Sequence, residues 1–114
     1  MGQAMNIQHK ELAAGRWAQM PFCEQMAHIG SEVSRALNWR KKGKDDFSKQ
    51  AVNRALELLG LAVQPVQKYS RLKELLRVKE ILIDFFYGSN EFASSEESWR
   101  KYFDHFNYRA RKNC

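Results

Sequence analysis

Only two prolines, Pro21 and Pro65, interrupt this chain of 114 residues. Between and after them, apolar residues recur at steps of three and four, which is the spacing of one face of an α-helix. Strand signals are absent. The sequence therefore predicts an all-α protein, with helices near residues 21–42, 46–62, 70–87 and 95–112.

Four amphipathic helices with short connections favour an antiparallel up-down-up-down four-helix bundle. A chain of this length has room for one domain, residues 1–114, in which residues 1–19 form an N-terminal extension that is partly disordered or a short helix. We expect one apolar set from all four helices in the core: Phe22, Ile29, Val33, Leu58, Leu75, Leu82, Phe86, Tyr102 and Phe106.

Capping residues support the predicted helix ends. A side-chain oxygen of Asp45 or Asp46 can accept hydrogen bonds from the free amides at the start of the second helix. Gly88 suits a left-handed stop after the third helix. Ser94 and Glu97 have the reciprocal spacing of a capping box at the start of the fourth.

The sequence also bears on the environment of the protein. Its longest strongly apolar stretch, residues 81–87, is far shorter than the roughly 20 residues that cross a bilayer, so no membrane span is expected. The N-terminus lacks the basic and apolar segments of a secretory signal. Cys23 and Cys114 lack the spacing of a disulfide scaffold or a metal knuckle. We therefore expect two free thiols and a cytoplasmic protein.

The third predicted helix carries more apolar residues than one seam of a bundle needs. Its core-facing stripe includes Leu76 and Ile83, and its final turns add Ile81, Phe85 and Tyr87. An apolar surface of this kind meets either the N-terminal segment or another subunit. We expect a homo-oligomer.

Polar residues follow the flanks of the first two predicted helices. Ion pairs Glu32–Arg54 or Arg35–Glu57 can form where these antiparallel helices meet. Such pairs fix the register of a seam more than they stabilise it.

The basic residues favour a polyanion as partner. The formal net charge is +6, and the cations gather at chain corners that lie at opposite ends of an up-down bundle. Lys and Arg neutralise phosphates, and an exposed aromatic ring can stack on a base. We expect RNA or DNA to bind by preference at the end that carries Trp39, Arg40, Lys41, Lys42 and Lys44, or else at the other end through Arg109, Arg111 and Lys112 beside Lys68 and Arg71. The alternative is a solvated basic surface that serves solubility.

No metal or cofactor site is expected. The Glu-x-x-His ligand pair of di-metal bundles does not occur, and no glycine is followed by the Lys-Ser/Thr of a phosphate loop. One catalytic pattern is present, because Arg100 and His105 have a spacing that resembles the Arg-x4-His motif of the HEPN ribonucleases, whose Arg and His meet across a dimer interface. The resemblance implies a histidine that moves protons of the RNA 2′-hydroxyl and an arginine that stabilises the phosphate. The alternative is a surface arginine and an ordinary histidine.

Most of the chain resembles an uncharacterised family of small prokaryotic helical proteins, on the runs GSEVSRALNWRKKG (30–43), RALELL (54–59) and RLKELL (71–76). More loosely, its size, basicity and helix order are similar to the four-helix-bundle proteins encoded in ribosomal RNA intervening sequences and to the accessory variability proteins of diversity-generating retroelements. Those two families imply a ring-like oligomer and nucleic-acid binding, and no site residue is carried over from them.

The sequence thus favours a non-enzymatic binding or assembly module that binds nucleic acid weakly through basic patches. A HEPN-like ribonuclease and a protein-binding accessory subunit of a nucleotidyltransferase are the alternatives. Neither composition nor periodicity separates the three.

Overall fold

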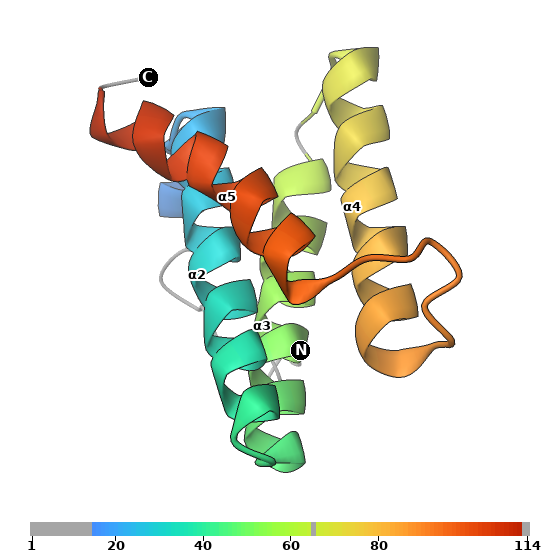
Figure 1. The fold of residues 1–114 in the computed structure, drawn as a ribbon. Coiled ribbons are helices and arrows are strands. Elements are labelled where there is room, and N and C mark those ends of the chain that lie inside the picture. Colours follow the sequence, from blue (N-terminus) through green and yellow to red (C-terminus); the bar gives the residue numbers. More distant parts are fainter. Residues whose placement is uncertain (1–14, 65, 113–114) are drawn as a thin grey trace, which may run out of the picture.

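The computed structural model describes residues 15–64 and 66–112, and every regular element in these ranges is a helix. The helices are α1 (Trp17–Gln19), α2 (Phe22–Lys41), α3 (Asp45–Val63), α4 (Tyr69–Tyr87) and α5 (Glu96–Arg111) (Figure 1). The all-α prediction is confirmed, and the four long helices lie within one residue of their predicted bounds. Of the predicted N-terminal extension, residues 1–14 lie outside the described residues.

Helix α2 lies along both α3 and α5 and makes more extensive contacts than any other described helix. Helix α4 packs on the other side of α3, and the short α1 also lies on α3. Figure 1 shows α5 crossing α2 obliquely rather than running alongside α4. These contacts are compatible with the predicted four-helix bundle.

The core lies between the four long helices. Six of the nine predicted core residues are buried, which are Ile29, Val33, Leu58, Leu75, Leu82 and Phe106. The other three, Phe22, Phe86 and Tyr102, are half-buried and pack against this core. The core also contains Trp17 from α1, whose carbonyl accepts a 2.8 Å hydrogen bond from Nε2 of Gln25.

A polar network joins α2 to α3. The buried Glu32 carboxylate accepts hydrogen bonds from Nε of Arg54 at 3.1 Å and from Nη1 of Arg35 at 2.8 Å. The predicted Glu32–Arg54 ion pair is therefore confirmed. Two guanidinium groups on one carboxylate compensate for the loss of water around it.

Two predicted helix ends differ from the structure. The residue that precedes α3 is Lys44, and its side chain does not cap the helix. Asp45 and Asp46 lie inside the first turn, where their negative charge interacts favourably with the helix dipole. The residue after α4, Gly88, has φ −105°, so the predicted left-handed stop is wrong. A left-handed glycine instead follows α2: Gly43, with φ +76°, turns the chain between α2 and α3.

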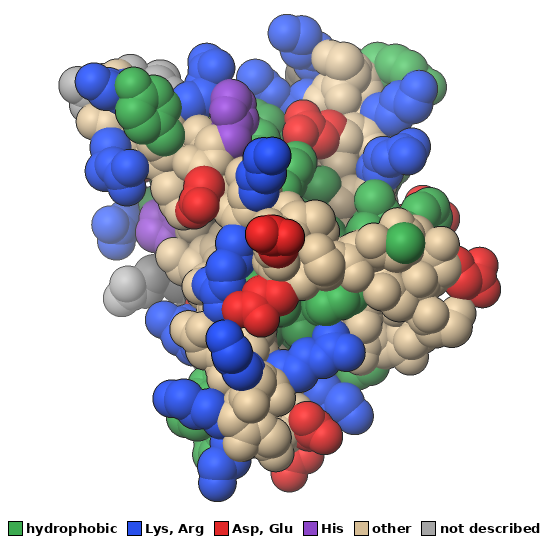
Figure 2. All heavy atoms as spheres, in the orientation of Figure 1, with side chains coloured by type: hydrophobic (Ala, Val, Ile, Leu, Met, Phe, Trp, Pro, Cys, Tyr) green, Lys and Arg blue, Asp and Glu red, His purple; other side chains and the backbone are tan. Residues whose placement is uncertain are grey.

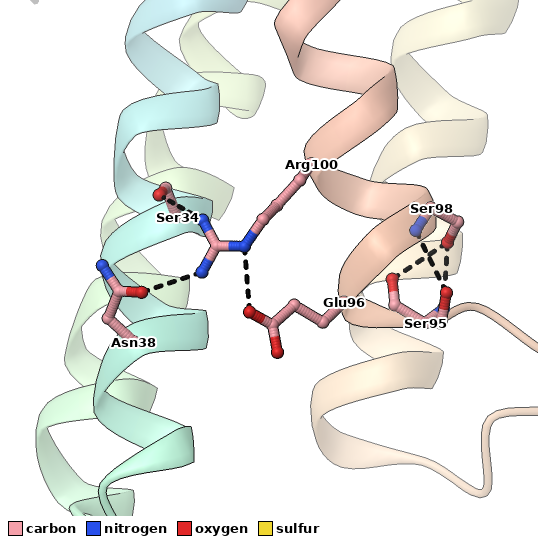
Figure 3. Close-up of polar contacts among 6 residues, drawn as sticks. All are labelled: Ser34, Asn38, Ser95, Glu96, Ser98 and Arg100. Carbon is pink, nitrogen blue, oxygen red and sulfur yellow. Dashed lines mark hydrogen bonds and ion pairs between the residues drawn. The ribbon is translucent and has the colours of Figure 1, made fainter.

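The capping box at the start of α5 lies one residue later than predicted. The amide of Ser98 donates to Oγ of Ser95 at 3.0 Å, and the amide of Ser95 donates to Oγ of Ser98 at 2.9 Å (Figure 3). The amide of Ser94 donates to Oδ1 of Asn90 at 2.9 Å in the preceding loop, so it does not make the reciprocal bond to Glu97 that the predicted box requires.

The apolar excess of α4 lies on a different side of the helix than predicted. Ile81 and Phe85 are half-buried and pack against the core, whereas Tyr87 is exposed as predicted and Leu76 and Ile83 are exposed as well. Phe47 at the start of α3 is also exposed. None of the helices within residues 15–64 and 66–112 has the length and apolarity needed to cross a membrane.

The prediction of a free thiol at Cys23 is wrong. This residue is buried in α2 and disulfide-bonded. Cys114 lies outside the described residues. The expected cytoplasmic location loses the support that was drawn from free cysteines.

Candidate nucleic-acid interface

The predicted basic residues occupy two ends of the molecule. Figure 1 places the turn between α2 and α3 at the lower end, and the start of α4 and the end of α5 at the upper end. Lys and Arg side chains cover both ends of the face shown in Figure 2. We name the first group the α2–α3 corner; it consists of Trp39, Arg40, Lys41, Lys42 and Lys44. We name the second group the C-terminal pole; it consists of Lys68, Arg71, Arg109, Arg111 and Lys112.

The aromatic residue of the α2–α3 corner is already stacked within the chain. The ring centroids of Trp39 and Phe47 lie 4.8 Å apart. The ammonium group of Lys42 lies 5.4 Å from the Trp39 ring. These contacts leave less of the Trp39 ring free to stack on a base.

Arg40 of the corner is also used internally. Its guanidinium lies 4.5 Å from the Phe85 ring centroid and 5.5 Å from that of Phe86, which ties the corner to the end of α4. Lys41, Lys42 and Lys44 are exposed. The corner therefore offers exposed cations, which the adjacent carboxylates 45 and 46 partly offset.

The C-terminal pole contains a cavity of about 570 Å³ between α2, α4 and α5. Two arginines of the pole, Arg71 and Arg109, line it from different helices. The Arg71 guanidinium lies 4.3 Å from the Phe22 ring centroid, and the Phe22 and Phe106 rings meet edge to face at 6.0 Å. The complete lining consists of Pro21, Phe22, Cys23, Arg71, Glu74, Tyr102, His105, Phe106 and Arg109.

Exposed tyrosines flank the cations of this pole. Tyr69 at the start of α4 and Tyr108 near the end of α5 are both exposed. The ammonium group of Lys112 lies 5.6 Å from the Tyr108 ring. Arg111 lines a smaller cavity of about 320 Å³ on the other side of α5, together with His28. Cationic and aromatic groups thus alternate over this end of the molecule.

A hydrogen bond between α4 and α5 lies at the boundary of two neighbouring cavities. The Tyr102 hydroxyl donates to Oε2 of Glu74 at 2.8 Å, and both residues line the 570 Å³ cavity and a neighbouring cavity of about 470 Å³. Burial raises the pKa of Tyr102, and the hydrogen bond to Glu74 and its charge raise that pKa further. The hydroxyl is therefore held protonated as a donor. The neighbouring cavity is more apolar, with Ile81 and Trp99 in its lining.

Arg100 of the predicted ribonuclease pair joins α5 to α2. Its Nη1 donates to Oγ of Ser34 at 2.9 Å, its Nη2 donates to Oδ1 of Asn38 at 2.8 Å, and its Nε donates to Oε2 of Glu96 at 2.9 Å (Figure 3). All three side-chain nitrogens therefore have partners in the chain. Charge-assisted hydrogen bonds of this kind hold α5 in place on α2.

His105 lies elsewhere on α5. It is exposed and lines the 570 Å³ cavity, with its ring 5.2 Å from that of Phe106. Arg100 lines a different cavity of about 100 Å³ between α2 and α5. The chain thus does not bring Arg100 and His105 into one cavity, and a joint site would need a second copy. The arginines that share a cavity with His105 are Arg71 and Arg109.

No group of three His, Cys, Asp or Glu side chains is placed to hold a metal ion within the part of the chain that the structure describes. No protein-family model, curated protein or solved structure matches the chain. The family resemblances noted in the sequence stay predictions.

Sequence reasoning did not find the cavity itself. The aromatic seam of α5 was visible as Tyr102 and Phe106 at helical spacing, and it was assigned to the core. The space that α4 and α5 leave beside these rings depends on how α5 crosses α2, for which the sequence carries no local signal.

Proposed function

We propose that the protein is a non-enzymatic module that binds RNA or DNA weakly, and without strong sequence preference, through the C-terminal pole. One observation carries the proposal: Arg71 and Arg109, from different helices, line one 570 Å³ cavity, and the exposed ring of Tyr108 lies at the same end of the molecule. Arginine binds phosphate in a bidentate manner, and aromatic rings stack on any base. A cavity of this volume is large enough for one nucleotide unit, since small-ligand sites occupy roughly 300–1,000 Å³.

The α2–α3 corner is the weaker candidate. Trp39 is stacked on Phe47, and the adjacent carboxylates 45 and 46 offset part of the positive charge. The remaining lysines attract phosphate without a neighbouring ring that is free to stack. We expect this corner to add to the attraction of polyanions at low salt rather than to form the site.

We infer that α2, α3, α4 and α5 form the antiparallel bundle that the sequence predicts. Two contacts between α2 and α3 support this arrangement: Oγ of Ser48 donates to the carbonyl of Ala36 at 2.8 Å, and Arg54 pairs with Glu32. Residue numbers rise along one helix as they fall along the other. A cytoplasmic location stays a prediction.

The test is a salt titration of binding to a labelled single-stranded RNA or DNA of about 20 nucleotides, measured by fluorescence anisotropy. Changing Arg109, Arg111 and Lys112 together to Gln should lower the slope of log affinity against log salt by up to about 2, since each phosphate contact on a single strand contributes about 0.7. The matched control changes the exposed Lys49, Lys79 and Lys101 to Gln, which removes the same charge. It should leave the slope nearly unchanged.

The same titration separates the two basic ends. Changing Arg40, Lys41 and Lys42 to Gln should weaken binding at low salt and change the slope less than the C-terminal substitutions do. Equal losses from all three sets would mean that net charge alone attracts nucleic acid, and the proposed site would be wrong.

Ribonuclease activity is the second candidate, and the exposure of His105 in the arginine-lined cavity favours it. A histidine beside cations can transfer protons while the cations stabilise the negative charge that develops on the phosphate oxygens in the transition state. If the purified protein cleaves RNA, His105→Ala should abolish cleavage without changing the circular dichroism spectrum. Equal cleavage by the wild type and the variant would indicate a contaminating nuclease.

A further inference from the structure

The outer side of α4 carries a second apolar stripe, separate from its core-facing side. Tyr69, Leu76 and Ile83 follow one another at seven-residue steps, with exposed fractions of 74%, 46% and 40%. The inner side of the helix supplies its buried residues, which are Leu75, Val78 and Leu82. The inner side of α4 packs in its own chain, and the outer apolar side stays exposed.

Two charged residues complete the outer stripe. Lys73 lies between Tyr69 and Leu76, and Glu80 lies between Leu76 and Ile83, so the steps alternate between four and three residues. The two seam positions of a coiled coil follow the same alternation, and here one of them is apolar in each heptad and the other is charged. Both charged side chains are exposed, and the Lys73 ammonium lies 6.0 Å from the Tyr69 ring.

The order of the charges selects one way of pairing two such helices. In a parallel pair, Lys73 would face Lys73 and Glu80 would face Glu80, and like charges across a seam oppose association. In an antiparallel pair centred on Leu76, Lys73 of each copy lies beside Glu80 of the other. The same register places Tyr69 against Ile83 and the two Leu76 side chains against each other. Charge and apolar pattern therefore agree on one arrangement.

We propose that two copies of this chain associate through the outer stripe of α4, antiparallel, with Leu76 at the twofold axis. The stripe is isologous, because each copy contributes the same residues to the contact, as a twofold interface requires. The Lys73–Glu80 pairs set the direction of pairing, and the apolar residues supply the favourable free energy.

The proposed arrangement also relates the two basic ends. Arg40 packs on Phe85 and so places the α2–α3 corner beside the end of α4, whereas Arg71 belongs to its first turn. Antiparallel pairing brings the corner of one copy near the C-terminal pole of the other. Their repulsion is screened at physiological salt, where the Debye length is about 8 Å. The dimer does not depend on nucleic acid, so its test contains none.

The experiment measures the mass of the full chain by sedimentation and light scattering, from low micromolar to near-millimolar concentration in physiological salt. The wild type should reach twice the 13.4 kDa mass of one chain. Lys73→Glu or Glu80→Lys alone turns two attractive pairs into two repulsive ones and should weaken dimerisation by about tenfold. The combined variant restores opposite charges and should return to within about threefold of the wild type.

The control is Lys101→Glu, which makes the same charge change at an exposed position of α5. It should leave the dimer intact. All of these substitutions are at exposed sites, and matching thermal unfolding at low concentration verifies the fold of each variant. A wild type that stays monomeric throughout, single reversals without effect, or a combined variant as weak as the single ones would each overturn the proposal.

Discussion

The Phe103 ring lies directly against the backbone of Gly30, so that a Cβ atom at position 30 would come within 2.8 Å of Cβ, Cγ and Cδ1 of Phe103. Both residues are buried, and they lie where α5 packs on α2. The missing side chain of Gly30 lets the two helices approach closely. This contact therefore contributes to how α5 crosses α2 and to the space that it leaves beside α4.

Gly30→Ala should lower the free energy of unfolding by about 1–3 kcal/mol, because the added methyl group must displace a packed aromatic ring. Urea denaturation followed by circular dichroism measures the change. The matched control is Gly60→Ala at an exposed position of α3, where an added Cβ meets nothing within 4 Å. That substitution should raise stability by up to about 1 kcal/mol through helix propensity. Equal effects at the two positions would contradict the close-approach explanation.

Arg100→Ala should also destabilise the protein, by about 1–2 kcal/mol, because Ser34, Asn38 and Glu96 lose a charged donor. The neighbouring Lys101 is exposed, and Lys101→Ala should change the free energy of unfolding by less than about 0.5 kcal/mol. Urea denaturation of both variants provides the comparison. An Arg100→Ala protein of wild-type stability would mean that the polar contacts between α5 and α2 are not structural, and it would strengthen the case for a role of Arg100 on a ligand.

The helix ranges were predictable because the signals that set them are local. Apolar spacing and the two prolines fix where a helix can run, whatever it later packs against. The cap of α5 was misplaced by one residue for a similar reason: Ser94 and Ser95 are equally suited to it, and only the hydrogen bond from Ser94 to Asn90 decides between them. Glu32–Arg54 was predictable once α2 and α3 were taken as antiparallel neighbours.

The orientation of α4 was not predictable from spacing. Leu75 is fully buried and the adjacent Leu76 is 46% exposed, although both fit an apolar stripe. Since α4 is apolar on two sides, the choice of its inner side depends on the position of α3. The candidate site depends on a further step, the divergence of α5 from α4. Charge clusters in the sequence could therefore indicate Arg71 and Arg109 as basic residues, but not that they share a cavity.

Tyr102 should make stability depend on pH in the alkaline range. Its pKa is raised in the folded state, chiefly by burial and then by Glu74, above the ordinary tyrosine value of 10.0. Below that value the group is protonated in both states and adds no pH dependence. Above it, the unfolded chain loses a proton that the folded chain keeps, so the free energy of unfolding falls by up to about 1.4 kcal/mol per pH unit from this group.

Urea denaturation at pH 9, 10 and 11 measures this slope. Tyr102→Phe should reduce the slope and, at neutral pH, lower the free energy of unfolding by about 1 kcal/mol through loss of the hydrogen bond to Glu74. Tyr69→Phe, at a highly exposed position, should keep the wild-type slope. The same slope in both variants would contradict a special environment of Tyr102.

Two leucines on opposite sides of α4 test both the core and the outer stripe. Leu82 is fully buried, so Leu82→Ala should lower the free energy of unfolding by about 2–5 kcal/mol through lost packing and the cavity left behind. Leu76→Ala should cost less than about 1 kcal/mol at low micromolar concentration, where the proposed dimer is dissociated. Both substitutions remove the same atoms from the same helix. Their difference therefore reports burial, and equal losses would mean that α4 faces the core differently.

The same pair of variants separates folding from association. If two copies pair through Leu76, the thermal midpoint of the wild type should rise with protein concentration, because binding that selects the folded state stabilises it by mass action. Leu76→Ala should flatten this dependence while leaving the midpoint at low concentration nearly unchanged. Leu82→Ala should lower the midpoint at every concentration and keep the dependence, since its side chain faces α3 and the core rather than a second copy. A concentration dependence that survives Leu76→Ala unchanged would place any association on another surface of the protein.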